Sequence, residues 1–169
     1  MNKRVIIAFI LVIIWAGFIF AFSNMNGQES NSKSYDIVDK IIEIYDKITN
    51  ANEEIVKYHQ SFIFREKANY VFRKMCHAFV YFTLSILVFN LLITIFKKKL
   101  LIYNFLTLLI CFIYAAIDEY HQTLVLERTG QFKDIIIDTF GAIIGCVFIS
   151  SVYKLVLKSV NNKKINELF

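Results

Sequence analysis

The chain has 169 residues and a formal net charge of +5, and 57% of its residues are hydrophobic. Its mean hydropathy is +0.52, and it contains three cysteines and no proline. A disordered chain would lack this apolar content, a small disulfide-bonded scaffold would need more cysteines, and a water-soluble domain would not contain apolar runs of about twenty residues. The length suits one domain, so the sequence predicts a small membrane protein in which residues 1–169 form a single domain.

Four apolar stretches are long enough to cross a bilayer as helices. The first covers residues 5–22 and holds no charged group. Its apolar run exceeds the core of a usual signal peptide and no small-residue cleavage site follows, so we interpret it as a retained span. The other stretches cover about residues 75–96, 100–117 and 135–153. The predicted fold class is an all-α membrane protein with four transmembrane helices.

The connection between the first two spans, residues 24–72, is the largest loop. Polar residues 30–34 predict a flexible stretch, whereas apolar residues spaced three and four apart over 35–49 predict an amphipathic helix. A break follows, and Asn52 is a suitable N-cap for a second helical stretch whose apolar residues continue to Ile63. Two interpretations stay open: helices that lie on the membrane surface, or a lid over a cavity between the spans.

The distribution of lysine and arginine predicts the orientation of the spans. With both termini in the cytoplasm, the inner segments hold nine basic residues and one acidic residue, and the other segments hold ten basic and thirteen acidic residues. The sequence thus predicts a multi-pass protein of the plasma membrane with residues 24–72 outside. This rule also explains the basic pI, so we expect no nucleic-acid partner. The inner bases are Lys3, Arg4, Lys97, Lys98, Lys99, Lys154, Lys158, Lys163 and Lys164.

Polar and charged side chains gather where three spans meet the predicted outer interface. Charges near a bilayer are costly, so those that are kept there need partners or a function. Asp138 lies about one helical turn inside the apolar boundary and is the most costly of them. Two interpretations stay open: ion pairs that fix the packing of the spans, and a polar binding site at the outer leaflet. The candidate binding residues are Arg73, Lys74, His77, Tyr81, Asp118, Glu119, Gln122, Arg128, Asp134 and Asp138.

Other motifs in the spans indicate packing rather than chemistry. Gly141 and Gly145 form a small-xxx-small pattern that favours close helix packing. The acids and histidines show no HExxH motif or tight ligand spacing, so we expect no metal site. No P-loop or dinucleotide fingerprint is present, and we expect no cofactor. The three cysteines lie in three different spans, and we interpret them as unpaired apolar fillers.

These polar residues resemble the motifs of the VanZ-like family. The family's earlier motif, a basic residue and a histidine followed by an aromatic residue, matches Lys74, His77 and Tyr81. The chain departs from the family pattern at Leu126-Glu127, where members often carry proline-glycine, and at Asp138, where asparagine is frequent. The resemblance implies a four-span membrane protein linked to tolerance of glycopeptide antibiotics, teicoplanin in particular. The later motif covers Asp118, Glu119, Gln122, Arg128, Gly130, Asp134, Asp138, Gly141 and Gly145, and Phe22-Ser23 matches a Phe-Ser pair.

Three functions are compatible with these residues. The first, which we favour, is a protein in the lipid bilayer that binds a lipid-linked cell-wall intermediate or the lipid-bearing antibiotic. Arg73, Lys74, Arg128 and His77 would then meet phosphate or carboxylate groups. The second is an intramembrane hydrolase or transferase of a lipid-linked substrate, with His77 or Glu119 as general base. The third is an assembly subunit whose polar groups only pack the spans together. The sequence leaves open whether the protein is an enzyme.

Overall fold

The computed structural model describes residues 2–96, 98–128 and 130–166, from residue 161 onward as backbone only. The regular structure of these residues is entirely helical. Four helices, α1, α4, α5 and α6, are long and apolar enough to cross a membrane, which confirms the predicted fold class. In chain order the elements are α1 (Lys3–Ser23), α2 (Gly27–Thr49), α3 (Glu53–His59), α4 (Phe62–Ile95), α5 (Leu100–Gln122) and α6 (Phe132–Asn166).

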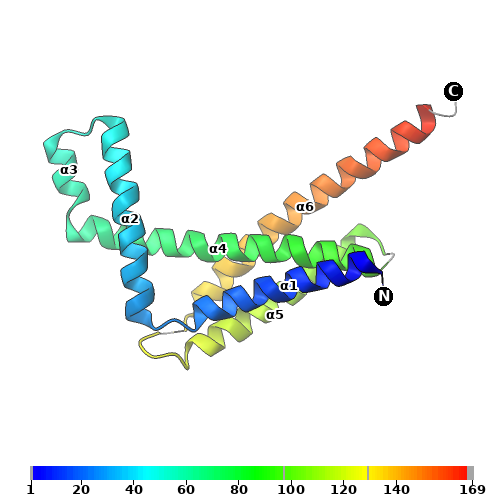
Figure 1. Ribbon diagram of the computed structural model, residues 1–169, viewed down its shortest axis with the longest axis horizontal. Helices are drawn as coiled ribbons and strands as arrows, with labels where there is room; N and C mark the ends of the chain where they lie inside the picture. Colours follow the sequence, from blue (N-terminus) through cyan, green and yellow to red (C-terminus); the bar gives the residue numbers. More distant parts are fainter. Residues whose placement is uncertain (1, 97, 129, 167–169) are drawn as a thin grey trace.

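The four long helices form a bundle in which α4 packs against α1, α5 and α6 (Figure 1). The N-terminus, the α4–α5 connection and the C-terminal end of α6 lie toward one end of the bundle. Helices α2 and α3 and the α5–α6 connection lie toward the other end. The segments at the first end are those that the charge distribution predicts on one side of the membrane, and the segments at the other end are those that it predicts on the opposite side. The side of the membrane on which each end lies stays a prediction.

The core of the bundle runs along α4, while the outward faces of the spans stay apolar and exposed. Exposed residues such as Ile14, Phe105 and Val147 fit helices whose outer surfaces contact lipid. Polar contacts join the middle of α1 to its neighbours: the Trp15 indole donates to the carbonyl of Val80, and the Tyr114 hydroxyl donates to the carbonyl of Ala16. The buried core comprises Ile19, Tyr81, Leu84, Val88, Phe89, Leu92, Tyr103, Cys111, Ala115 and Ala142.

Helices α4 and α6 approach each other closely at two glycines of α6. A Cβ atom on Gly141 would overlap the backbone of Ala78, and one on Gly145 would overlap the carbonyl of Phe82 and the Ser85 hydroxyl. Small residues allow two helix backbones to approach in this way. His77 is next to Ala78 on α4, and Asp138 lies almost one turn before Gly141 on α6. The close contact at Ala78 and Gly141 therefore brings His77 near Asp138.

The predicted boundaries of the first loop helix need correction. Helix α2 begins at Gly27 rather than near residue 35, so residues 30–34 are helical and not a flexible stretch. The reason is a strong N-cap, because the side chain of Asn26 accepts hydrogen bonds from the backbone N–H groups of Gln28 and Glu29. The helix ends at Thr49 and is capped by Asn50, whose left-handed conformation (φ 50°) turns the chain out of the helix.

The second helical stretch of the loop is divided between two helices. Asn52 is the N-cap of α3, as predicted, but α3 ends at His59, and Ser61 caps a new helix, α4. Phe62 and Ile63 therefore belong to α4, which begins well before the predicted span. With 34 residues, α4 is about 51 Å long, whereas the hydrocarbon core of a bilayer is about 30 Å thick. Its first turns must project beyond that core, and hydropathy cannot detect them because they carry charges.

Candidate functional site

A polar cavity of about 550 Å³ opens at the end of the bundle where α2 crosses α4. Its walls come from α2, α4, the end of α5, the α5–α6 connection and the start of α6. Residues up to about one hundred positions apart in the sequence therefore meet around one space. Six of the ten candidate residues line it, namely Arg73, Lys74, His77, Gln122, Arg128 and Asp134.

The remaining candidates, Tyr81, Asp118, Glu119 and Asp138, are buried and do not line the cavity. Asp118 accepts a hydrogen bond of 3.1 Å from the Gln122 side chain, which also donates to Ser23 at 2.9 Å. Glu119 accepts a hydrogen bond from the backbone N–H of the cavity residue Gln131. Two of these acids thus hold lining residues in place.

Two arginines of the cavity are not matched by acids. Arg73 donates from Nη1 to Asn31 Oδ1 at 3.3 Å, and Arg128 donates from Nη2 to the carbonyl of Phe22 at 3.1 Å. Among the described side chains neither guanidinium forms an ion pair. Burial lowers the pKa of Arg128 and the charge of the nearby Arg73 lowers it further, whereas the charges of Asp118 and Glu119 act in the opposite direction. The lining also contains the acids Glu66, Glu127 and Asp134. The two arginine cations repel each other, so the part of the wall that they form favours an anion.

The other two basic groups of the cavity already face acids on α6. Lys74 Nζ pairs with Asp134 and lies over the ring of Tyr70, 5.2 Å from its centroid. His77 Nδ1 lies 3.5 Å from Asp138 Oδ1. Across the described part of the chain, neither Asp138 oxygen has a hydrogen-bond partner, although the residue is fully buried. A buried carboxylate without hydrogen bonds is costly, so Asp138 depends on His77 for compensation.

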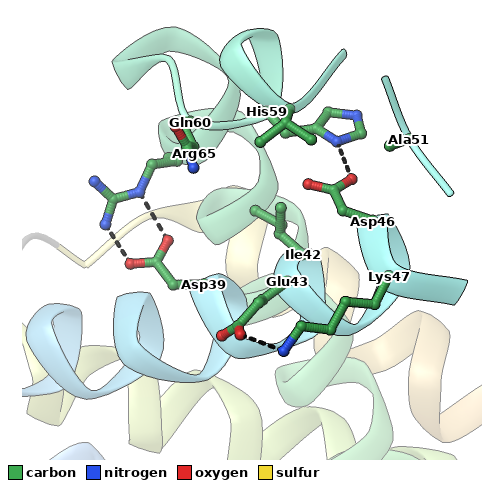
Figure 2. Close-up of a pocket in the computed structure, with 10 residues that line it drawn as sticks. Asp39, Ile42, Glu43, Asp46, Lys47, Ala51, His59, Gln60 and Arg65 are labelled. Atoms are coloured by element: carbon green, nitrogen blue, oxygen red, sulfur yellow. Dashed lines mark hydrogen bonds and ion pairs between the residues drawn. The ribbon is translucent and has the colours of Figure 1, made fainter. Parts of the chain in front are cut away.

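A second cavity, of about 640 Å³, lies between α2, α3 and the start of α4 (Figure 2). Its lining differs from that of the polar cavity because each of its basic side chains faces an acid. Figure 2 shows Arg65 with Asp39, His59 with Asp46, and Lys47 with Glu43. This cavity contains none of the candidate residues, and its balanced charges give an anion no free partner.

Several lining residues of the polar cavity are absent from the sequence prediction. Asn31 and Tyr35 come from α2, and Asn69 and Tyr70 come from α4. Asn69 precedes Arg73 by four residues and therefore lies on the same helix face as Arg73 and His77. The sequence pattern could have predicted it if the polar face had been followed one turn toward the N-terminus. Asn31, which accepts a hydrogen bond of 2.8 Å from Asn69, gave no such signal, because its segment reads as flexible.

The α5–α6 connection closes one rim of the cavity against the start of α2. The Gly27 backbone N–H donates to the carbonyl of Leu126 at 3.2 Å, and the Gln28 side chain donates to Glu127 Oε1 at 2.9 Å. These bonds hold Arg128 beside α2. Within the described ranges, no group of three His, Cys, Asp or Glu side chains could hold a metal ion.

Comparison with known proteins places the chain in a family. The family model described as VanZ/LLP1 matches residues 8–155, which include every residue that lines the polar cavity. Because this match covers most of its length, the chain belongs to the VanZ/LLP1 family. No curated protein and no solved structure matches the chain.

Proposed function

We propose that this VanZ/LLP1 protein lies in the plasma membrane with both termini in the cytoplasm. Its polar cavity, open to the outside, binds an anionic group of a lipid-linked cell-wall intermediate or of the lipid-bearing glycopeptide antibiotic. Through this binding it contributes to tolerance of teicoplanin-type antibiotics. The observation that carries the proposal is the pair Arg73 and Arg128, two guanidinium groups on the wall of one cavity that form no ion pair with any side chain that the structure describes.

The chemistry of the two arginines suits phosphate or carboxylate groups. A planar guanidinium donates paired hydrogen bonds to such anions. Binding there would break no ion pair, since Lys74 and His77 face Asp134 and Asp138. It would also relieve the repulsion between the two cations. The acids of the cluster therefore hold the other bases and leave the arginines to the ligand.

The position of the cavity suits a ligand with a lipid tail. In α4 the polar segment ends at Lys74, which lines the cavity, and the apolar segment begins at Met75. Met75 and Phe79 are exposed on the outside of the bundle. An amphiphile could hold its headgroup in the cavity while its chain stays among the bilayer lipids.

Replacing either arginine by alanine tests the proposal. We expect the Arg73→Ala and Arg128→Ala proteins to insert at wild-type levels but to lose antibiotic protection, measured as the minimum inhibitory concentration. In nanodiscs, their affinity for a polyprenyl diphosphate or for teicoplanin should fall by roughly 10-fold or more, because a hydrogen bond to a charged group contributes about 1.5–3 kcal/mol. Lys57→Ala, which removes an exposed cation from α3 outside both cavities, is the matched control and should change neither property.

The two ligands are distinguished by the same binding measurements. Binding of the polyprenyl diphosphate alone identifies the cell-wall intermediate, and binding of teicoplanin alone identifies the antibiotic. Mass spectrometry of the incubated lipid reports any turnover, which would assign the protein to an enzyme class instead. Wild-type protection and wild-type binding by both arginine variants would refute the proposal.

A further inference from the structure

Helix α2 presents an isoleucine stripe, which we define as Ile37, Ile41, Ile44, Tyr45 and Ile48. These side chains are 47% to 76% exposed. Their spacing of three, four and seven residues puts them on one face of the helix. An exposed apolar face of this size indicates that the helix contacts an apolar partner.

The face of α2 opposite the stripe is the one that packs against the rest of the protein. Figure 2 shows Asp39 and Asp46 directed toward Arg65 of α4 and His59 of α3, with Ile42 between them. Val38, which is buried, lies at the edge of the stripe next to Tyr45. At about 100° per residue, Asp39 and Asp46 lie roughly opposite the centre of the stripe. Neither α3 nor α4 therefore covers it.

The direction of α2 places the stripe at a membrane surface. Figure 1 shows α2 running across the spans rather than along them, with α3 on the side of α2 away from the spans. The stripe therefore points back along the spans. The first half of α2 contacts α4 through Asn31, which hydrogen-bonds Asn69 and Arg73, and the apolar part of α4 begins two residues later at Met75. This is the level at which a bilayer around the spans must end.

The charges on α2 match the same location. Lys33, Lys40 and Lys47 recur every seven residues along one edge of the stripe. Lys33 pairs with Glu29 and Lys47 with Glu43, and the part of the chain that the structure describes offers Lys40 no ion pair. Lysines at the edge of an apolar face extend their ammonium groups into the phosphate layer while their alkyl stems cover lipid.

We propose that α2 is an interfacial membrane anchor, with its isoleucine stripe inserted into the leaflet that surrounds the polar cavity. The partner is the bilayer itself, since the stripe faces the same lipid that the outward faces of the spans contact. The first half of α2 lines the cavity, whereas the stripe occupies the second half. Helix α2 thus combines the two roles that the sequence left open, a cover for the cavity and a surface helix. Lipid contact with the second half holds the first half over the cavity.

Site-specific fluorescence tests this anchor. Single cysteines replace Ile41 and Ile48 on the stripe, and Asp36 and Glu43 on the flank, in a Cys76→Ser background in which the remaining cysteines are buried. Each variant carries an environment-sensitive dye and is reconstituted in vesicles whose lipids are brominated on the acyl chains. We expect blue-shifted emission and severalfold stronger quenching for Ile41→Cys and Ile48→Cys than for Asp36→Cys and Glu43→Cys.

Two results would overturn the anchor. Equal emission and equal quenching at stripe and flank positions would show that the stripe stays in water. A second contrary result is blue-shifted emission that is not quenched by the brominated lipids but changes with the number of protein molecules per vesicle. It would show that another polypeptide covers the stripe. The measurement involves neither the arginines nor a ligand, so its outcome is independent of the proposed function.

Discussion

Asp138 and His77 show how one contact between two spans sets the chemistry of single residues. Asp138 is fully buried, and in the described part of the chain its carboxylate has only the ion pair with His77, at 3.5 Å. This pair lies beside the contact of Gly141 with Ala78. Burial of an ion pair with few hydrogen bonds usually adds little stability. The pair is therefore better explained as a device that positions His77, which lines the cavity.

Asp138→Asn tests this interpretation. The amide keeps the shape of the side chain but removes the buried charge, and His77 can then stay neutral. We expect the free energy of unfolding to be unchanged or to rise by about 1 kcal/mol, measured by thermal unfolding in detergent. A clearly lower unfolding temperature would show instead that the charged pair stabilises the packing of α4 and α6.

At the scale of the elements, the close contact between α4 and α6 depends on two residues without a side chain, Gly141 and Gly145. A methyl group on Gly141 would meet the backbone of Ala78, which cannot move without shifting a whole helix. Gly17 in α1 offers the opposite case, because a Cβ there would meet nothing within 4 Å. Two glycines in spans of one protein thus differ only in what faces them.

This difference predicts opposite outcomes for two identical substitutions. Gly141→Ala should lower the free energy of unfolding by about 1–3 kcal/mol, the usual cost of overpacking. Gly17→Ala should leave it unchanged or raise it slightly, because alanine favours helix more than glycine does. Unfolding of the purified proteins, followed by circular dichroism, checks both. Equal stability of the two variants would contradict the role given to Gly141.

At the scale of the whole molecule, the bundle separates the basic segments near the termini from the polar cavity. The N-terminus, the α4–α5 connection and the end of α6 share one end (Figure 1), and they carry most of the excess lysine and arginine. The positive-inside rule predicts that this end lies in the cytoplasm. The cavity and α2 would then face the outside, where cell-wall intermediates and antibiotics are met.

Labelling of intact cells tests that orientation. In a Cys76→Ser background, Glu54→Cys on α3 should react with a membrane-impermeant maleimide added from outside. Ser159→Cys on α6, which is also exposed, should react only after the cells are opened. The reverse pattern would place the polar cavity in the cytoplasm and remove it from the outer leaflet.

The sequence by itself determined the features that depend on local composition. The four spans, the N-cap at Asn52 and the family motifs can be read from it, because hydropathy and capping act within one segment. The sequence also predicted the members of the polar cluster, because a charged residue in or next to an apolar span is recognisable without knowing the direction of its side chain. It missed the early start of α4, because charged turns that extend a span beyond the lipid resemble a loop.

Only the tertiary structure decided which members of the cluster have partners. Arg73 and Lys74 are neighbours in the sequence, yet Lys74 faces Asp134 whereas Arg73 turns to Asn31 of α2. The outcome depends on how α6 and α2 cross α4, and no pattern within α4 encodes that crossing. The same packing left the isoleucine stripe of α2 uncovered, because α3 and α4 contact the opposite face. Partners are a property of the contact between helices, and for this reason charge and hydropathy alone could not assign them.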